Sequence, residues 1–384
     1  MIDMRTARTS EIDEIEEAVN EIVEQLDLPT LKKHAGGLLY CHRDYIESGV
    51  VEALCEALPF DVIGMTAMAG ADEHGYGKYD LTLTVLTSDE VSFVGGMTGS
   101  IERDNYKDEL KQLYTSLRYD IGGDPSLIIT FMPHMKDVAG CELVTEMDAV
   151  CSGIPMWGSL TNSDNFNYET VQTIGNGKNL ATATAMLLIR GPIDPKFFVH
   201  SIPERNIANA RVIVTKSIGT RLYEVNDQPI MEYLAKIGLV ITKENITTAP
   251  IMVYYNNSEK PVALGFYSIF DDGSVLTGGE MPVGTSISVG SIDAQGIFET
   301  AEAGLNNILA CEDRSVTLLL PCITRYIMLS PDQDAELRLI TEKLDEDGKP
   351  FSMGYSGGEI SPLLGPDGKL YNQFHNYTFC ACVI

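Results

Sequence analysis

The spacing of hydrophobic and polar residues predicts alternating helices and strands along the first half of the chain. Apolar residues three and four positions apart predict an amphipathic helix, capped by Ser10 with Asp13 three residues later, and its apolar positions are Ile12, Ile15, Val19, Ile22, Val23 and Leu26. The stretches "AGGLLYCH" and "FDVIGMTA" predict short strands, and a second helix between them is predicted to be capped by Asp44.

The next segment continues this pattern with strands that are shorter and more often adjacent. "LTLTVLT" and "VSFVGG" predict two strands joined by a tight turn at Ser88, Asp89 and Glu90. A helix around residues 104–119 precedes the strand "SLIITFM", and "GIPMWGSLTNSDNF" is interpreted as a loop flanking a helix. With the buried strand "ATATAMLLIRG", this order indicates a layered domain with a mixed sheet.

After residues 200–210 the pattern restarts. "RVIVTKSIGTRLYEV" predicts a hairpin, and the helix in "QPIMEYLAKIG" ends at Gly238, a natural C-cap. Strands in "APIMVYY" and "VALGFYSIF" precede a further hairpin in "SVLTGGEMPVGTSISVGSI". Helices around residues 292–310 and 331–344 flank the predicted strand "SVTLLLPCITRYIML", and a terminal strand pair ends the chain.

These elements predict an α+β fold in α/β layers, with two domains. Each domain is expected to hold a mixed, largely antiparallel sheet flanked by helices. The predicted organisation is a helical lead-in over residues 1–34, a first domain over 35–205 and a second over 206–384. A chain of 384 residues is long enough for two such cores.

Composition and charge narrow the classes of function. The formal net charge of −28 argues against nucleic acid and against an anionic membrane surface, because both require a basic face. The chain has no apolar run of 18 residues, and its N-terminus turns acidic without a hydrophobic segment. We therefore expect a cytoplasmic protein with no membrane partner.

The usual catalytic signatures are absent from the sequence. It contains no Walker loop, no G-x-G-x-x-G after a strand, no H-E-x-x-H and no G-x-S-x-G. Its eight cysteines form no C-x-x-C pair, which favours reduced and mostly buried thiols over a zinc or redox centre. No catalytic residue is predicted, and an enzyme is the less favoured class.

Two groups of residues nevertheless could surround a ligand. The C-terminal group is Arg325, Tyr355, Glu359, His375 and Asn376, and the first-half group is Trp157, Ser159 and Asn162. Arg325 could pair with Glu359 or bind a ligand carboxylate, and Trp157 could supply an apolar wall. The alternatives are purely structural roles: a buried ion pair, a terminal hairpin, and a turn whose polar side chains bind the backbone.

Cys322 and the histidines leave two further hypotheses open. Cys322 with His375 could form a nucleophile–base pair, although a thiol in an apolar segment is more often inert. None of the six histidines shares a helical face with a second His or Cys, so no metal site is predicted from protein ligands alone. Haem needs only one axial histidine, which keeps a haem protein as an alternative.

The segments, in this order, resemble the FIST sensory module, FIST-N followed by FIST-C. The first half is similar to FIST-N in "GLLYCHRDYIESGVVEALCEALPFDVIGMTAMAG" and in "GIPMWGSLTNSD". The second half resembles FIST-C in "VIVTKSIGTRLYEVNDQPIMEYLAKIG", in "VLTGGEMPVGTSISVGSIDAQGIFETAEAGL" and in the closing set "PCITRYIML", "MGYSGGEISP" and "FHNYT". The resemblance covers roughly residues 35–384.

The resemblance implies a cytoplasmic sensor of small ligands, amino acids among them. Some members of the family are joined to output domains, some sense nitric oxide through haem, and eukaryotic members include F-box adaptors. No kinase, cyclase or F-box segment follows the FIST-C-like region here, so we expect signalling through a protein partner or an oligomer. The resemblance carries no haem ligand over to a matched histidine of this chain, so no cofactor is predicted.

Overall fold

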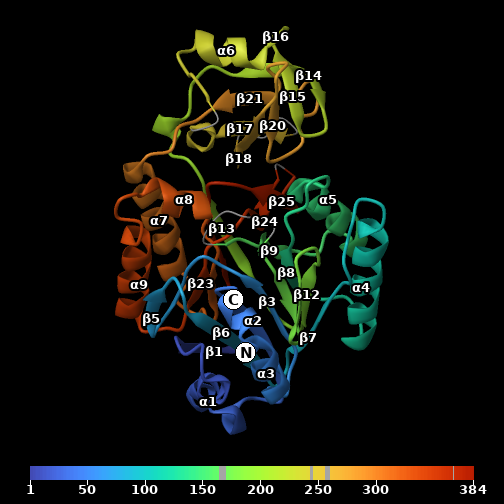
Figure 1. Ribbon diagram of the computed structural model, residues 1–384, viewed down its shortest axis with the longest axis vertical. Helices are drawn as coiled ribbons and strands as arrows, with labels where there is room; N and C mark the ends of the chain where they lie inside the picture. The colour runs from blue at the N-terminus through green and yellow to red at the C-terminus, as the bar shows by residue number, and fades with distance from the viewer. Residues whose placement is uncertain (164–169, 243–244, 256–259, 366) are drawn as a thin grey trace.

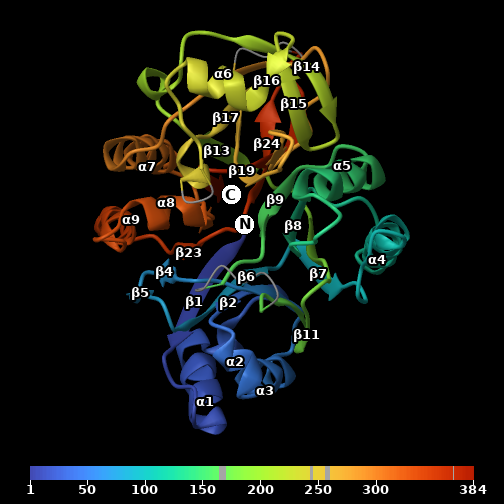
Figure 2. The same ribbon diagram turned by 45° about the horizontal axis from the view of Figure 1, so that its top comes forward.

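A computed structural model describes residues 1–163, 170–242, 245–255, 260–365 and 367–384. The described chain forms a large part, here called the body, and a smaller part, here called the lobe, which spans residues 212–289. Figures 1 and 2 show the lobe above the body, with both termini in the body. Residues 201–211 and 290–293 connect the two parts.

The body contains three six-stranded sheets, called sheets A, B and C. The strands of sheet A, in spatial order, are β1 (Asp3–Thr9), β6 (Leu81–Ser88), β2 (His34–Cys41), β3 (Val62–Thr66), β10 (Thr173–Gly175) and β11 (Lys178–Leu180). Those of sheet B are β13 (Lys196–His200), β26 (Phe379–Val383), β22 (Thr317–Leu319), β23 (Ser352–Gly354), β4 (Gly70–Asp72) and β5 (Gly75–Gly77). Those of sheet C are β25 (Leu370–His375), β24 (Glu359–Leu364), β9 (Met156–Leu160), β8 (Leu127–Met132), β12 (Ala185–Arg190) and β7 (Ser92–Met97).

Each of these sheets combines antiparallel pairs with a parallel pair whose crossover is helical. The parallel pairs are β2–β3, β22–β23 and β8–β9. The helices between them pack on the outer faces, because parallel strands need a crossover that returns to the same edge. These crossover helices are α2 (Asp44–Glu47), α3 (Val50–Ala57), α8 (Ile323–Met328), α9 (Ala335–Asp347) and α5 (Gly140–Cys151).

The inner faces of the three sheets meet in one apolar core. Leu38 from sheet A, Leu318 from sheet B and Trp157 from sheet C all belong to it and are fully buried. Three more helices complete the outer cover, and they are α1 (Ile15–Leu26), α4 (Tyr106–Asp120) and α7 (Ala294–Leu309). Figure 2 shows the resulting three groups of helices around the sheets: α1–α3, α4–α5 and α7–α9.

The lobe is a nearly closed antiparallel barrel of short strands. In spatial order the strands are β18 (Val262–Leu264), β17 (Ile251–Tyr254), β21 (Ser286–Val289), β14 (Val212–Ile218), β15 (Arg221–Val225), β20 (Val275–Thr277) and β19 (Phe266–Ile269), with β16 (Gln228–Pro229) beside β15. Helix α6 (Ile230–Lys236) packs its buried Leu234 into this barrel. Short 3₁₀ turns lie at Leu28–Thr30, Glu204–Asn206 and Ile246–Thr248.

The predicted α+β class is confirmed, but the described strands form four sheets rather than one sheet in each half. Two of the sheets combine strands from both sides of the predicted boundary at residues 205 and 206. β24 pairs with β9, and β26 pairs with β13. Residues 313–384 therefore belong spatially to the body, beside strands of the first half.

Several local predictions were wrong in instructive ways. The predicted helical lead-in begins with a strand, β1, and Glu11 rather than Ser10 accepts the backbone N–H groups before α1. The helix after Asp44 is two helices, because Gly49 between them has a φ of 90°. β6 and β7 were predicted to form a hairpin but belong to different sheets. β20 and β21 do not form a hairpin either, because each pairs with other strands.

Two corrections concern candidate residues directly. "MWGSL" within "GIPMWGSLTNSDNF" forms the buried strand β9 rather than part of a loop beside a helix. "PCITRYIM" forms the N-terminal turn and body of helix α8, with Cys322 at the N-cap, rather than continuing strand β22. Asp164 to Phe166, which were part of the predicted loop, lie outside the described residues. Among the residues described, no helix is long and apolar enough to span a bilayer.

Candidate functional site

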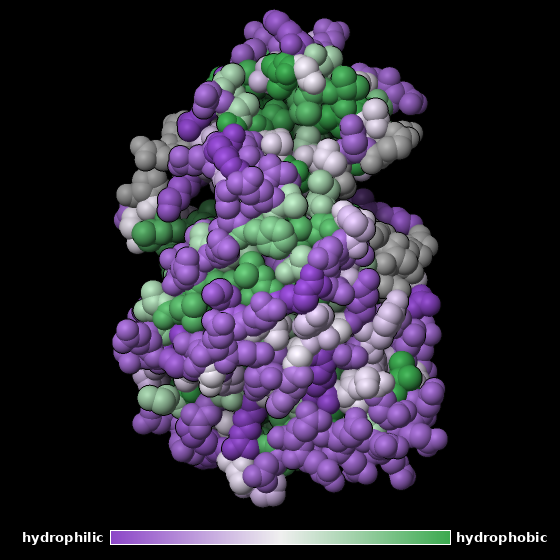
Figure 3. All heavy atoms as spheres, turned by 90° about the vertical axis from the view of Figure 1, so that its left-hand side faces the viewer, coloured by the Kyte–Doolittle hydropathy of each residue, from purple (hydrophilic) through white to green (hydrophobic). Residues whose placement is uncertain are grey.

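A cavity of about 790 Å³ lies between the body and the lobe. The body contributes the segment from His134 to Gly140, the start of α8 and the residues after β25. The lobe contributes Gly265, Phe266 and Tyr267 with residues from β20. Figure 3 shows the narrowing of the molecular surface between lobe and body.

One wall is the segment His134–Gly140, which follows β8 and leads into α5. The C-terminal ends of parallel strands meet at one edge of a sheet, and β8 is paired in parallel with β9. The N-terminus of α5 therefore faces the cavity at Gly140, where the first N–H groups of a helix favour an anion. A side chain at Gly140 would come within 2.8 Å of Leu160 and Phe374, so the close approach needs glycine.

Charged groups of both signs occur along this wall. Lys136 and Asp137 line the cavity beside Glu142. Glu142 is already engaged, because its side chain accepts from the Ala139 N–H at 3.2 Å and from the guanidinium of Arg103 at 2.5 Å. Lys136 and Asp137 are the other charged residues along this wall.

The opposite part of the body wall is a corner between β25 and β26, formed by Asn376 and Tyr377. Tyr377 has a φ of 63°, a left-handed conformation that is costly for an aromatic residue. Both residues line the cavity. The backbone N–H of Thr378, which follows them, donates to a carboxylate oxygen of Glu359 at 3.2 Å.

Asn376 connects this corner to the lobe. Its backbone N–H donates to the carbonyl of Ala263 at 2.9 Å. Its side-chain Oδ1 accepts from the backbone N–H of Gly265 at 3.0 Å and from the hydroxyl of Tyr267 at 3.4 Å. Of the residues that the sequence suggested as ligand-binding, Asn376 lines the cavity and also bonds to the lobe.

Arg325 and Tyr355 lie elsewhere, in a buried polar network under the corner. The Arg325 guanidinium forms an ion pair with Glu336 at 2.6 Å, and both side chains are fully buried. The Tyr355 hydroxyl donates to the other Glu336 oxygen at 3.2 Å. The proposed pairing of Arg325 with Glu359 is therefore wrong, and neither Arg325 nor Tyr355 lines the cavity.

Arg325 instead forms hydrogen bonds to the backbone next to the cavity wall. Its guanidinium donates to the Tyr377 carbonyl at 3.4 Å and to the Ile297 carbonyl at 2.8 Å. A third bond goes to the hydroxyl of Thr300 at 2.9 Å. The planar group thus satisfies several donors at once, which a buried guanidinium requires.

Glu359 and His375 are both buried, and burial shifts the pKa of each group in the direction that favours its neutral form. Burial raises the pKa of Glu359 to about 8, although its bonds to Thr378 partly oppose this. Burial lowers the pKa of His375 to about 4, and Nε2 of that ring lies 3.2 Å from the Ser361 carbonyl. Oxygen Oε1 of Glu359 is buried without a hydrogen bond that meets the usual geometry.

Cys322 lines the cavity at the N-cap of α8, but its environment disfavours a thiolate. Burial raises the pKa of this thiol well above its ordinary value, and the nearby Glu359 adds to the effect. A nucleophilic cysteine needs the opposite shift. His375 is occupied at Ser361, so the Cys322–His375 hypothesis gains no support from either group.

Trp157, Ser159 and Asn162 stabilise the body and do not line the cavity. Trp157 is fully buried between the sheets. The Ser159 hydroxyl bonds that of Ser356 at 2.8 Å. Asn162 accepts from the Met68 N–H at 2.8 Å and donates to the Tyr355 carbonyl.

Sequence reasoning missed the segment "HMKDVAG" and the lobe wall. The segment follows a predicted strand and precedes a helix, which is the position where α/β sheets commonly bind ligands. This order of strand, loop and helix could have identified the segment from the sequence. The contribution of Gly265 and Thr277 was not readable, because it depends on how the barrel is placed against the body.

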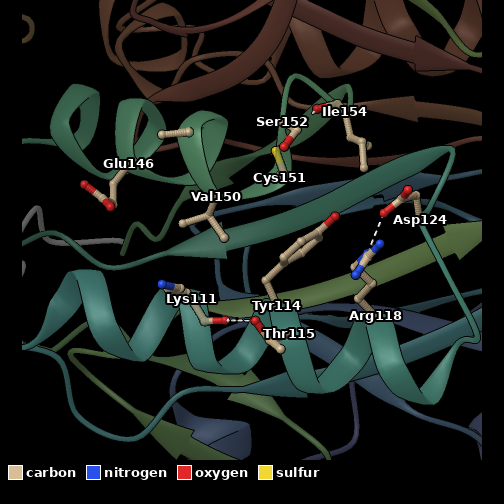
Figure 4. A pocket seen from close by; sticks show the side chains of 11 residues that line it. Lys111, Tyr114, Thr115, Arg118, Asp124, Glu146, Val150, Cys151, Ser152 and Ile154 are labelled. Carbon is tan, nitrogen blue, oxygen red and sulfur yellow. Dashed lines mark hydrogen bonds and ion pairs between the residues drawn. The ribbon is translucent and has the colours of Figure 1, made fainter.

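Two other hollows are less suitable as ligand sites. A groove of about 670 Å³ runs between α4 and α5 (Figure 4), where Arg118 pairs with Asp124 at 2.5 Å and the Thr115 hydroxyl donates to the Lys111 carbonyl at 2.7 Å. Three of its charged lining residues already form ion pairs, Arg118 with Asp124 and Glu146 with Lys107. A hollow of about 420 Å³ adjoins the far side of the His134–Asp137 segment.

Comparison with known families assigns almost the whole chain. The FIST N domain matches residues 36–228, and the FIST C domain matches residues 230–362. The chain belongs to the FIST family. The cavity is therefore built from both family domains, because His134 lies in the first matched range and Gly265 in the second.

Solved structures similar to this FIST protein include two cyanuric acid hydrolases. That from A. caulinodans shares 8% identity with a TM-score of 0.25, covering 49% of this chain and 71% of its own. A second, described as an evolutionary innovation by structural concatenation, shares 7% identity with a TM-score of 0.31, covering 76% and 99% respectively. Neither likeness is strong enough to carry an argument about this chain, and no curated protein matches it.

Proposed function

We propose that this FIST protein is a small-ligand sensor, that the cavity between body and lobe is its binding site, and that lobe position is its output. The cavity of about 790 Å³ carries the proposal, because its walls come from both FIST domains. The volume lies within the usual range for small-molecule sites. A ligand that contacts both walls alters the equilibrium between lobe positions.

The lining favours a small zwitterion such as an amino acid. Lys136 and the α5 N-terminus suit a carboxylate, and Asp137 suits an ammonium group. Phe266, Phe374 and Ile327 supply apolar surface for a side chain. This agrees with the ligand class expected from the family resemblance.

We propose that a change in the position of the lobe is detected by a protein partner or by a second copy of this chain, which binds the lobe. Figure 3 shows hydrophobic residues gathered on the lobe. Ile218 is 73% exposed and Val283 is 65% exposed. Exposed apolar side chains of this kind can bind a partner whose position depends on the lobe.

The haem alternative fits the described residues poorly. His134 is the described histidine that lines the cavity, and burial lowers its pKa to about 4. Its Nε2 is packed against Gly357, where an added Cβ would lie 2.6 Å away, and its ring interacts with the Thr161 backbone. An axial ligand needs that nitrogen directed at the open volume. A Soret band in protein from haem-supplied cells would contradict this conclusion.

A thermal-shift screen of the standard L-amino acids tests the proposed function. Saturating ligand stabilises the folded protein by RT ln(1 + [L]/Kd), or about 2.7 kcal/mol at one hundred times Kd. Leu276→Trp, which fills the cavity from the lobe, is expected to abolish the shift. Ile218→Trp is the matched control, since it adds the same ring to the same barrel at an exposed position. A flat screen with the wild-type protein contradicts the amino-acid proposal.

A further inference from the structure

We propose that the carboxamide of Asn376 is the switch that couples the cavity to the lobe: its oxygen holds the lobe and its NH₂ group binds an acceptor atom in the cavity. The proposal deepens the proposed function and rests on it for the identity of the site. It assigns regulation to one side chain of the body–lobe junction.

The oxygen side of the switch is defined by its donors. The Gly265 N–H and the Tyr267 hydroxyl both point to Oδ1. A backbone N–H can only donate, which fixes the orientation of the amide and places Nδ2 on the other side. Gly278 leaves room for this arrangement, because a Cβ at that position would collide with Oδ1.

The nitrogen side has no comparable partner. Within the described part of the chain, Nδ2 donates no hydrogen bond. It is also not among the polar atoms that are fully buried without a partner. The residue lines the cavity although it is only 5% exposed. An unpaired amide at a nearly closed wall is expected to bind a carboxylate or carbonyl oxygen, because leaving it unpaired is costly.

The backbone at this position is rigid, which allows one side chain to act as a junction. Tyr377, directly after Asn376, holds a left-handed φ of 63°. The Arg325 guanidinium binds the Tyr377 carbonyl, and Glu359 binds the N–H of Thr378. Strained backbone persists only where the surroundings determine it. The buried network therefore fixes the corner, and the freedom at the junction lies in the lobe.

The coupling follows from the two ends of one planar group. An acceptor bound at Nδ2 polarises the amide and strengthens the bonds that Oδ1 accepts from the lobe. It also holds the side chain in the rotamer that those bonds require. Occupancy of the cavity thereby favours the attached position of the lobe, and loss of the lobe contact weakens binding by the same factor.

Hydrogen exchange at the Gly265 amide measures the oxygen side without any ligand. Asn376→Ala removes both ends of the switch, and exchange at Gly265 is expected to accelerate about tenfold. Asn376→Asp keeps the acceptor and removes the donor, so exchange in the absence of amino acids stays within about twofold of wild type. Tyr267→Phe removes the longer of the two bonds to Oδ1 and leaves the Gly265 bond in place, so it is expected to give a smaller acceleration than alanine. Unchanged exchange in Asn376→Ala would overturn the proposal.

The nitrogen side is tested with the standard L-amino acids and with sodium acetate as a minimal carboxylate, each at millimolar concentration. A probe that binds wild type is expected to slow Gly265 exchange, and Asn376→Asp is expected to bind it at least about tenfold more weakly. Equal binding by wild type and Asn376→Asp overturns the coupling. If no probe binds wild type while the alanine and aspartate variants differ as expected, the lobe latch stands and the amino-acid proposal fails.

Discussion

The body and the lobe of this FIST protein are stabilised in different ways. The body buries three sheets against one another, covers their outer faces with helices and encloses the Arg325–Glu336 pair. The lobe is one barrel of short strands. It is joined to the body through residues 201–211 and 290–293, through the Asn376 corner, and through a buried apolar cluster that contains Phe266 of the lobe and Phe374 of the body. The sensor function proposed above needs a fixed reference and a part that responds, and the difference between body and lobe suits these two roles.

The strongest test of this contrast is removal of the buried charge pair from the body. Arg325→Met leaves Glu336 buried without its partner and should lower the free energy of unfolding by about 3–5 kcal/mol. Urea denaturation measures the change. The double variant Arg325→Met/Glu336→Leu is the control, and it should recover much of the loss because no unpaired charge remains. Equal destabilisation by the single and double variants would show that packing rather than charge dominates.

A pair of cavity-creating variants compares the two parts directly. Leu187→Ala in the body and Leu222→Ala in the lobe each remove a fully buried side chain, for about 2–5 kcal/mol. The lobe variant is expected to separate unfolding into two transitions, with protection of body amides retained in the first. The body variant is expected to unfold in one. Hydrogen exchange followed through the urea transition distinguishes these outcomes, and a single transition in both variants would contradict an independently mobile lobe.

The pH dependence of stability sharpens the comparison further, because Glu359 titrates within the body. Its folded pKa of about 8 lies above the ordinary value of 4.5 for an exposed glutamate, so the folded state holds the proton more tightly. The stabilisation is complete below pH 4.5 and is lost as pH rises towards 8, by about 1.4 kcal/mol per pH unit. Glu359→Gln should remove this slope.

Measurement between pH 6.5 and 8 isolates the glutamate. His134 and His375 have folded pKa values of about 4, lowered from 6.5, so their own slopes lie below pH 6.5 and have the opposite sign. Ser159→Ala is a suitable control on the neighbouring strand, since it removes a hydroxyl and no charge. A wild-type slope that persists in Glu359→Gln would assign the pH dependence to another group.

Much of the local structure was readable from the sequence. The 3.6-residue periodicity placed α7, which Asp293 caps through the Gly296 N–H, and Gly238 marks the end of the α6 region with a φ of 85°. The α+β class and the FIST resemblance followed from the same patterns. The error at "PCITRYIM" arose because an apolar run of this length fits a strand or a short helix equally well.

The candidate site was only partly predictable. Asn376 does line the cavity, whereas Arg325 and Glu359 lie beneath the corner and Trp157 lies in the core. Residue type indicated that these side chains were unusual for their surroundings. It could not indicate whether the polar partner would be a ligand or another part of the protein.

The sequence by itself determined most helices and strands, the acidic net charge and the family, because each depends on residues close together in the chain or on composition. Only the tertiary structure decided that Glu336 rather than Glu359 pairs with Arg325, and that the Gly265 N–H donates a hydrogen bond to the side chain of Asn376. The physical reason is that these partners meet through strand pairings between distant segments, such as β9 with β24. Hydrophobic burial selects the face that each strand buries, but many neighbours satisfy that requirement, and packing of the whole body selects among them.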